Sequence, residues 1–152
     1  LCNRMYGRQN NLTFIEGNSM NLSFEDESFD VVYNVESSHC YSDMSQFIQE
    51  AHRVLRQGGH LAWTDFRDQK TMQSIHESFL SIGFKIEEKA DITPEVVAAL
   101  DLVSDDKKSR IKKGTGPIIR RSFETFAGVR GTPVYDSFTN GELGYFRYLL
   151  KK

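Results

Sequence analysis

The chain has 152 residues, about the length of one domain, and a formal net charge of −2 from 19 basic and 21 acidic side chains. This nearly balanced charge disfavours a nucleic-acid footprint over the whole chain. Two cysteines, Cys2 and Cys40, provide no disulfide framework, and no apolar run approaches membrane-span length. We therefore expect a cytoplasmic protein without stable membrane insertion.

The first half of the chain contains short apolar runs separated by turns. Leu12 to Gly17 predicts a buried strand that ends in a turn. Phe29 to Val35 is rich in valine and predicts a second strand, buried on both faces. The acidic residues 25–27 between them are consecutive, a spacing unsuited to a calcium loop, so we predict a solvated turn and no metal site.

Asp43 to Arg56 has the clearest helical periodicity, with apolar side chains at spacings of three and four residues. Asp43 is placed to cap this helix, Gln46 to complete a capping box, and the glycine pair Gly58-Gly59 to end it. His60 to Phe66 then predicts a third strand.

The second half predicts further helices and strands. In chain order they are a helix from Asp68 to Ile82 closed by Gly83, a strand near a sheet edge from Phe84 to Ile92, a helix that starts at Thr93-Pro94, a short helix within Pro117 to Gly128, and an antiparallel strand from Leu143 to Leu150. Short strands that alternate with helices indicate an α/β fold, because parallel strands need crossover connections. Ligands of such sheets bind beyond the carboxyl ends of the strands, where Asn18, His39 and Asp65 are expected to meet.

The runs FIEGNSMNLSFEDESFDVVYNVESSHCY and FIQEAHRVLRQGGHLAWTDFR resemble the middle and later motifs of class I S-adenosylmethionine-dependent methyltransferases of the type 11 small-molecule and lipid group. The resemblance implies a partial Rossmann-like sheet, with three to four parallel strands, a C-terminal antiparallel strand and a helical insert before it. It divides the chain into residues 1–92 of the core, an insert or lid at 93–141, and the last core strand at 142–152. The family's glycine-rich first turn is absent, so we expect the C-terminal portion of such an enzyme.

The same resemblance implies where the cofactor S-adenosyl-L-methionine would bind. Asn18 stands where the family has an acidic residue that accepts the adenine amino group, and its amide oxygen can keep that role. The implied cofactor residues are Asn18, Ser19, Met20, Asn34, Val35 and Glu36. A simple turn at Asn18 is the alternative.

In the family, the residues just past the fourth strand lie between cofactor and substrate. His39 is at such a position, which makes it the candidate base for methyl transfer. The predicted substrate residues are Ser38, Tyr41, Asp65 and Arg67. Two alternatives stay open: His39 as an ordinary loop residue, and Asp65 and Arg67 as structural ions. No G-x-S-x-G elbow supports hydrolase chemistry, and Val35-Glu36-Ser37 replaces the Pro-Pro-aromatic motif that amide and nucleobase methyltransferases share.

The insert carries two features with alternative interpretations. The aromatics Phe123, Phe126, Tyr135 and Phe138 suit either a substrate pocket or ordinary core packing. The basic run from Lys107 to Lys113 is either a solvated face or an attraction for an anionic substrate or membrane surface.

The resemblance thus implies methyl transfer to a small, lipid-like molecule, and we expect oxygen as the acceptor, with carbon and nitrogen left open. The alternative is a non-catalytic α/β module that self-associates as a homodimer, or binds a protein, through an unpaired strand edge. A nicotinamide-dependent oxidoreductase is disfavoured because the glycine-rich turn is missing.

Overall fold

The computed structural model describes Cys2, Met5, residues 11–114 and residues 128–152. The elements are β1 (Phe29–Val35), the 3-10 turn η1 (Ser38–Cys40), α2 (Met44–Val54), β2 (Leu55–Arg67), α3 (Gln69–Ile82), β3 (Lys85–Asp91), α4 (Thr93–Gly114), α6 (Pro133–Thr139) and β4 (Gly144–Lys151). The strands form one sheet in the order β1-β2-β4-β3. β1 and β2 are parallel, and β4 is antiparallel to both β2 and β3. The α/β prediction, with an antiparallel final strand, is confirmed.

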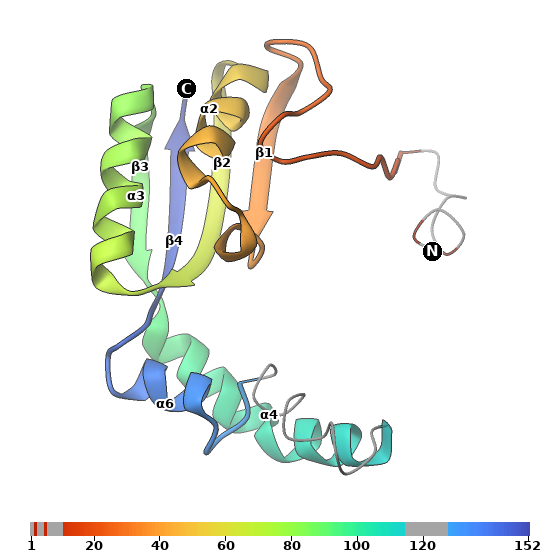
Figure 1. Cartoon of the computed structure of the whole chain (residues 1–152), viewed down its shortest axis with the longest axis vertical. Coiled ribbons are helices and arrows are strands. Elements are labelled where there is room, and N and C mark those ends of the chain that lie inside the picture. The colour runs from red at the N-terminus through yellow and green to blue at the C-terminus, as the bar shows by residue number, and fades with distance from the viewer. Residues whose placement is uncertain (1, 3–4, 6–10, 115–127) are drawn as a thin grey trace.

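Helices α2 and α3 cover one face of this sheet (Figure 1). Both begin where the sequence predicts: Asp43 accepts a hydrogen bond from the Gln46 amide at 2.9 Å, and Asp68 does the same for the Thr71 amide at 2.9 Å. Gly83 ends α3 with φ of 116°, a conformation that glycine adopts readily. The core between the helices and the sheet contains Phe47, Ile48, Ala51, Leu55, Leu61, Trp63, Met72, Ile75, Phe79, Phe84, Phe146, Tyr148 and Leu150.

The predicted end of α2 at Gly58-Gly59 is wrong. The helix ends at Val54, and the glycines lie within β2. Gly58 has φ of 81°, and a Cβ on Gly59 would approach the Asp30 carbonyl oxygen to 2.9 Å. The pairing of β1 with β2 is irregular over this stretch, so the glycines allow a bulge and a close backbone approach.

The predicted strand at Leu12 to Gly17 is also wrong: the structure gives this stretch no strand. Its apolar side chains are largely outside the core, with Leu12 40% and Ile15 64% exposed. An apolar run needs a neighbouring strand to become a strand, and no described strand pairs with this stretch.

β3 lies at an edge of the sheet, as predicted, and an irregularity between Ile86 and Glu88 explains the break in its alternation. α4 and α6 lie beyond the end of the sheet at which β1 and β2 finish (Figure 1). The predicted helix within Pro117 to Gly128 falls, up to residue 127, outside the described residues. Of the helices described, none is long and apolar enough to cross a membrane.

Candidate active site

Asp65, at the carboxyl end of β2, is the centre of a buried polar network and has no exposed surface. One carboxylate oxygen accepts hydrogen bonds from the Ser38 hydroxyl at 2.7 Å and the His39 amide at 2.9 Å, and lies 3.2 Å from Nη1 of Arg67. The other oxygen lies 2.9 Å from His39 Nδ1 and accepts from the Phe66 amide at 2.9 Å. The sequence thus brings the ends of β1 and β2 together at one carboxylate.

Burial alone would raise the pKa of Asp65. The hydrogen bonds from Ser38 and His39, followed by the charge of Arg67, outweigh burial and hold this pKa below its ordinary value. The carboxylate is therefore ionised at neutral pH, where it can only accept hydrogen bonds.

Ser38 and Arg67 contact the Asp65 oxygen that does not face the His39 ring. The Ser38 hydroxyl accepts hydrogen bonds from Trp63 Nε1 and from Arg67 Nη2, each at 3.0 Å. The Arg67 guanidinium also lies 5.8 Å from the centre of the Trp63 ring, within the range of a cation–π contact. Ser38, Asp65 and Arg67 are all buried, and the substrate roles predicted for them stay predictions.

His39 reaches the surface from this network, and its side chain is 28% exposed. The ring packs against that of Phe66, with ring centres 4.6 Å apart. Behind Phe66, the rings of Phe138 and Tyr145 lie 5.8 and 6.2 Å from it. The imidazole is thus held by a carboxylate on one edge and by an aromatic ring on one face.

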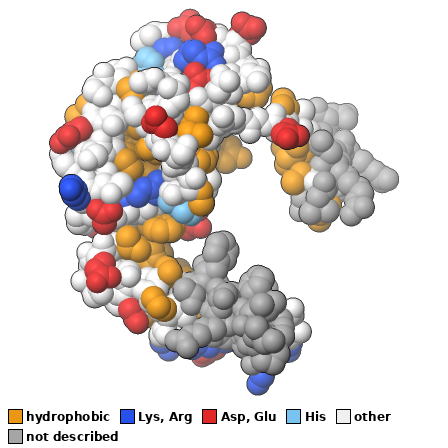
Figure 2. Space-filling model, viewed as in Figure 1, with side chains coloured by type: hydrophobic (Ala, Val, Ile, Leu, Met, Phe, Trp, Pro, Cys, Tyr) orange, Lys and Arg blue, Asp and Glu red, His pale blue; other side chains and the backbone are white. Residues whose placement is uncertain are grey.

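His39 and Phe66 line a pocket of about 530 Å³ between the end of the sheet and the helices α4 and α6. Figure 2 shows His and apolar side chains where the sheet meets these helices. The other lining residues are Glu36, Cys40, Val96, Leu100, Gly128, Val134, Phe138 and Tyr145. The walls are mainly apolar, and the polar groups come from the loop after β1 and the start of β4. Such a pocket fits an apolar molecule with one polar end.

Glu36 and Tyr145 connect across this pocket. The Tyr145 hydroxyl donates a hydrogen bond to the Glu36 carboxylate. Burial, and then the neighbouring Glu36 carboxylate, raise the pKa of Tyr145, so its hydroxyl keeps its proton at neutral pH. The contact ties the loop after β1 to β4.

Asn34, at the end of β1, forms a second polar cluster with Ser37 and Tyr41. Asn34 Nδ2 donates to the Ser37 hydroxyl and to the Tyr41 hydroxyl, each at 2.9 Å. Asn34 is 7% exposed, and its Oδ1 is buried without a hydrogen-bond partner among the residues described. Buried polar atoms without a partner are rare, so this oxygen is a candidate ligand contact.

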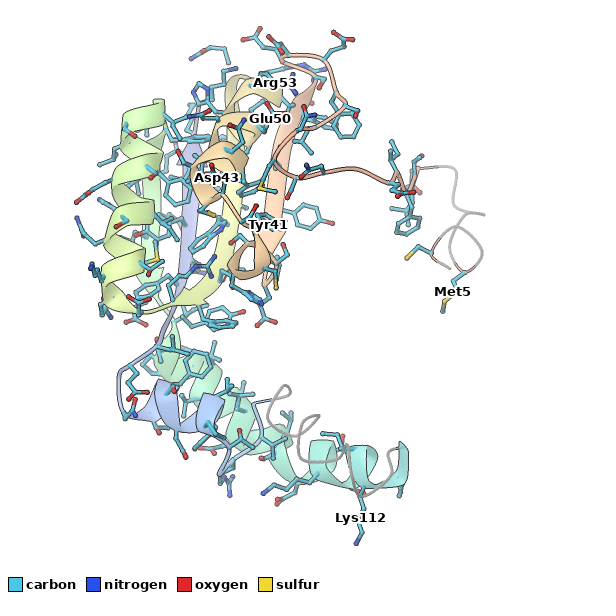
Figure 3. The ribbon with its side chains drawn as sticks, viewed as in Figure 1. Met5, Tyr41, Asp43, Glu50, Arg53 and Lys112 are labelled. Atoms are coloured by element: carbon cyan, nitrogen blue, oxygen red, sulfur yellow. The ribbon has the colours of Figure 1, made fainter. Side chains whose placement is uncertain are left out.

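A second hollow, of about 500 Å³, shares His39 and Phe66 with the first pocket and lies beside α3. Tyr41, Ser38 and Arg67 line it together with hydroxyl side chains of α3. Figure 3 shows Tyr41 at the start of the connection into α2. His39 therefore lines both an apolar pocket and a more polar one.

The remaining predicted cofactor residues are not brought into this network. Asn18 accepts a hydrogen bond from the Met20 amide at 3.0 Å, which is the turn that the alternative interpretation expects. The Met20 sulfur accepts a hydrogen bond from the Ser42 hydroxyl at 3.4 Å, beside the second hollow. Ser19 lies between Asn18 and Met20 in the chain. The Val35 side chain is 56% exposed on the uncovered sheet face. Cofactor roles for these residues stay predictions.

Sequence reasoning missed Trp63 and Tyr145, which belong to the site through contacts with Ser38 and Glu36. Both lie in strands that were interpreted as core, and nothing in the local sequence shows which strand positions reach the pocket. Of the predicted pocket aromatics, Phe138 lines it, whereas Tyr135 donates a hydrogen bond to Asp101 of α4 at 2.8 Å. Phe123 and Phe126 lie outside the described residues. No group of His, Cys, Asp or Glu in the described part of the chain is arranged to hold a metal ion.

The described strands thus form a four-stranded α/β sheet with a reversed final strand and a polar site at the strand ends, as the resemblance to methyltransferases predicts. Residues 1–63 match the family described as a methyltransferase domain. The chain is 34% identical over 141 residues to a phthiotriol/phenolphthiotriol dimycocerosates methyltransferase of Mycobacterium leprae, covering 93% of the chain and 52% of that protein. It is 28% identical to a fatty-acid O-methyltransferase of Mycolicibacterium smegmatis, with 93% and 51% covered.

The fold matches a solved protein from Galdieria sulphuraria, assigned as a sarcosine dimethylglycine methyltransferase, with a TM-score of 0.81. The identity is 18%, and the match covers 99% of this chain and 63% of that one. Sequence and fold together confirm the resemblance to class I S-adenosylmethionine-dependent methyltransferases. The chain spans about half the length of the curated relatives it matches.

Proposed function

We propose that the protein containing this chain transfers a methyl group from S-adenosylmethionine to a small, lipid-like molecule. The observation that carries this proposal is the placement of His39: a buried carboxylate holds its ring at the wall of an apolar pocket of about 530 Å³. Methyl transfer needs in-line positioning, exclusion of water and a base where the acceptor carries a proton. The chain provides groups suited to each.

The walls of the pocket support a substrate with an apolar body. Val96 and Leu100 of α4 and Val134 and Phe138 of α6 face the sheet end across it. An acyl or other hydrocarbon chain would bury apolar surface there at about 25 cal/mol per Å². The fatty-acid substrate in the name of one relative agrees with this chemistry. We favour an oxygen acceptor, since a hydroxyl or carboxyl at the polar end would meet His39.

The chain's polar groups fit part of the cofactor. S-adenosylmethionine carries an ammonium group, a carboxylate and a sulfonium, and supplies the methyl group. Asn34 Oδ1 is a buried acceptor that the described residues leave without a donor, and an ammonium donor would satisfy it. The Glu36 carboxylate, which accepts the hydrogen bond from Tyr145, provides negative charge nearby in the chain. Asn18, Ser19 and Met20 are proposed for the adenine.

His39 would accept the proton that a hydroxyl acceptor loses, through the ring nitrogen that does not face Asp65. Phe66, Phe138 and Tyr145 would shield the reacting groups from water. A cytoplasmic location stays a prediction, consistent with the free thiols of Cys2 and Cys40.

The test compares His39→Ala with the wild type in the full-length protein that contains this chain. We expect turnover to fall about 10²- to 10⁴-fold, the usual contribution of a general base, while the calorimetric affinity for S-adenosylmethionine stays within about twofold. His60→Ala is the matched control, because His60 pairs with Glu87 at 3.1 Å, away from the site. Unchanged turnover in His39→Ala would remove His39 from the mechanism.

One observation favours self-association as a second candidate property. β1 lies at an edge of the described sheet, and Val31, Tyr33 and Val35 are 57%, 77% and 56% exposed. Unpaired strand edges with apolar side chains promote pairing between chains. A homodimer through this surface is the alternative proposal.

A further inference from the structure

We propose that Asp65 is a positioning residue, which fixes the His39 ring in the tautomer that carries its proton on Nδ1 and directs Nε2 at the substrate. The inference deepens the proposed function and rests on it for its catalytic consequence. The tautomer itself is a property of the chain and is measurable without any substrate.

The assignment follows from the hydrogen-bonding capacity of the two groups. An ionised carboxylate has no proton to donate, so the 2.9 Å contact between Asp65 and His39 Nδ1 requires the proton to be on Nδ1. In a neutral imidazole the other nitrogen, Nε2, then carries the lone pair. A general base must present a lone pair to the proton it removes.

Asp65 cannot readily turn away from this contact. Its two oxygens also accept from the backbone amides of His39 and Phe66, each at 2.9 Å, so both are anchored to main chain. The Ser38 hydroxyl donates to Asp65 at 2.7 Å while accepting from Trp63 and Arg67, so its single proton is committed to the carboxylate. The donors arranged around Asp65 therefore leave one orientation for the carboxylate.

The His39 ring is restrained as well. Its backbone amide and its side chain bond to the two oxygens of one carboxylate, which fixes both ends of the residue. Phe66 covers one face of the ring. His39 lines both pockets, and the ring nitrogen that does not face Asp65 is the one left to contact a ligand.

A purely structural role for Asp65 makes a different prediction. A structural ion pair with Arg67 stabilises the end of β2 and gives the Nδ1–H tautomer of His39 no part in methyl transfer. The two roles are separated by comparing turnover with cofactor affinity in an Asp65 variant.

The first measurement is the imidazole ¹⁵N spectrum of this chain at about pH 8, above the ordinary histidine pKa. His39→Gln identifies the His39 signals among those of the other histidines. We expect the wild-type ring to be predominantly protonated on Nδ1. A ring protonated mainly on Nε2 would overturn the proposal without any measurement of turnover.

The second measurement uses Asp65→Asn, with Asp43→Asn as the matched control at the exposed start of α2. In Asp65→Asn we expect a lower Nδ1–H population and, in the full-length protein, a turnover about 10²- to 10⁴-fold lower with cofactor affinity unchanged. Asp43→Asn should change neither, because an amide oxygen also caps a helix.

The outcomes separate this inference from the proposed function. Methyl transfer that persists in Asp65→Asn within about twofold of wild type would contradict the positioning role and leave the proposed function intact. A wild-type ring in the expected tautomer, in a full-length protein that transfers no methyl group, would contradict the proposed function instead.

Discussion

Glu36 adopts a left-handed backbone conformation, with φ of 46°, directly after β1. Non-glycine residues in this region carry steric strain, and such residues cluster at functional sites. Here the conformation places the Glu36 carboxylate at the pocket, where it accepts the hydrogen bond from Tyr145. The contact with Tyr145 is thus obtained at the cost of local backbone strain.

The strain can be measured by comparing two substitutions that both remove the carboxylate. Glu36→Gly should be more stable than Glu36→Ala by about 1 kcal/mol, because glycine adopts positive φ without a Cβ clash. At Val35, within β1, we expect the reverse: Val35→Ala should be more stable than Val35→Gly, since glycine weakens a strand interior. Urea unfolding of the two pairs provides the free energies. Equal stabilities for the two Glu36 variants would show that the backbone is unstrained.

At the scale of elements, α2 holds the loop that precedes β1. Glu50 accepts from the Leu22 amide at 2.7 Å and from Arg53 Nε at 2.9 Å. Arg53 in turn donates to the Phe24 carbonyl at 2.8 Å and to Asp26 at 2.7 Å. Figure 3 shows Glu50 and Arg53 side by side on α2, beside this loop. The acidic residues that the sequence identifies as a solvated turn are partly paired.

We expect Arg53→Met to release this loop without unfolding the sheet. Amide exchange between Leu22 and Ser28 should accelerate at least about tenfold, because the side chain that holds the loop carbonyls is gone. Arg56→Met is the control, since Arg56 forms one exposed pair with Asp30. Hydrogen-exchange mass spectrometry provides the comparison. Equal acceleration of exchange in both variants would show that Arg53 does not hold this loop.

Local patterns predicted most of the elements but not all of their limits. Periodicity and caps located α2 and α3, because Asp43, Asp68 and Gly83 satisfy helix-end groups by local contacts. The run at Leu12 to Gly17 has the composition of a strand, but pairing is decided by neighbours far away in the chain. The position of β4 between β2 and β3 is likewise a matter of long-range pairing.

The site was predictable to the extent that it follows strand ends. His39 and Asp65 meet because parallel strands deliver their carboxyl ends to one edge. Tyr145 and Trp63 were not predictable, because their roles depend on the register of β4 and on which face of β2 a side chain occupies. Asn18 was expected with His39 and Asp65, yet its described hydrogen bonds stay within its own turn.

At the scale of the whole molecule, the sheet is covered unevenly. α2 and α3 pack on one face, while the other carries a shallow hollow of about 290 Å³ between β1, β2 and β4. Tyr33 and Val35 line this hollow with Ala62 and Leu149. Contiguous apolar surface next to an edge strand favours association in water.

We therefore expect the 152-residue chain to self-associate, with its average mass in light scattering rising between about 10 and about 200 µM. Tyr33→Lys should weaken association at least about tenfold, since a charge on the β1 face opposes burial and edge pairing. Leu102→Lys is the control, because Leu102 is 86% exposed on α4, remote from β1 in sequence and structure. A monomer throughout this range, or equal weakening by both variants, would exclude the β1 face as the contact.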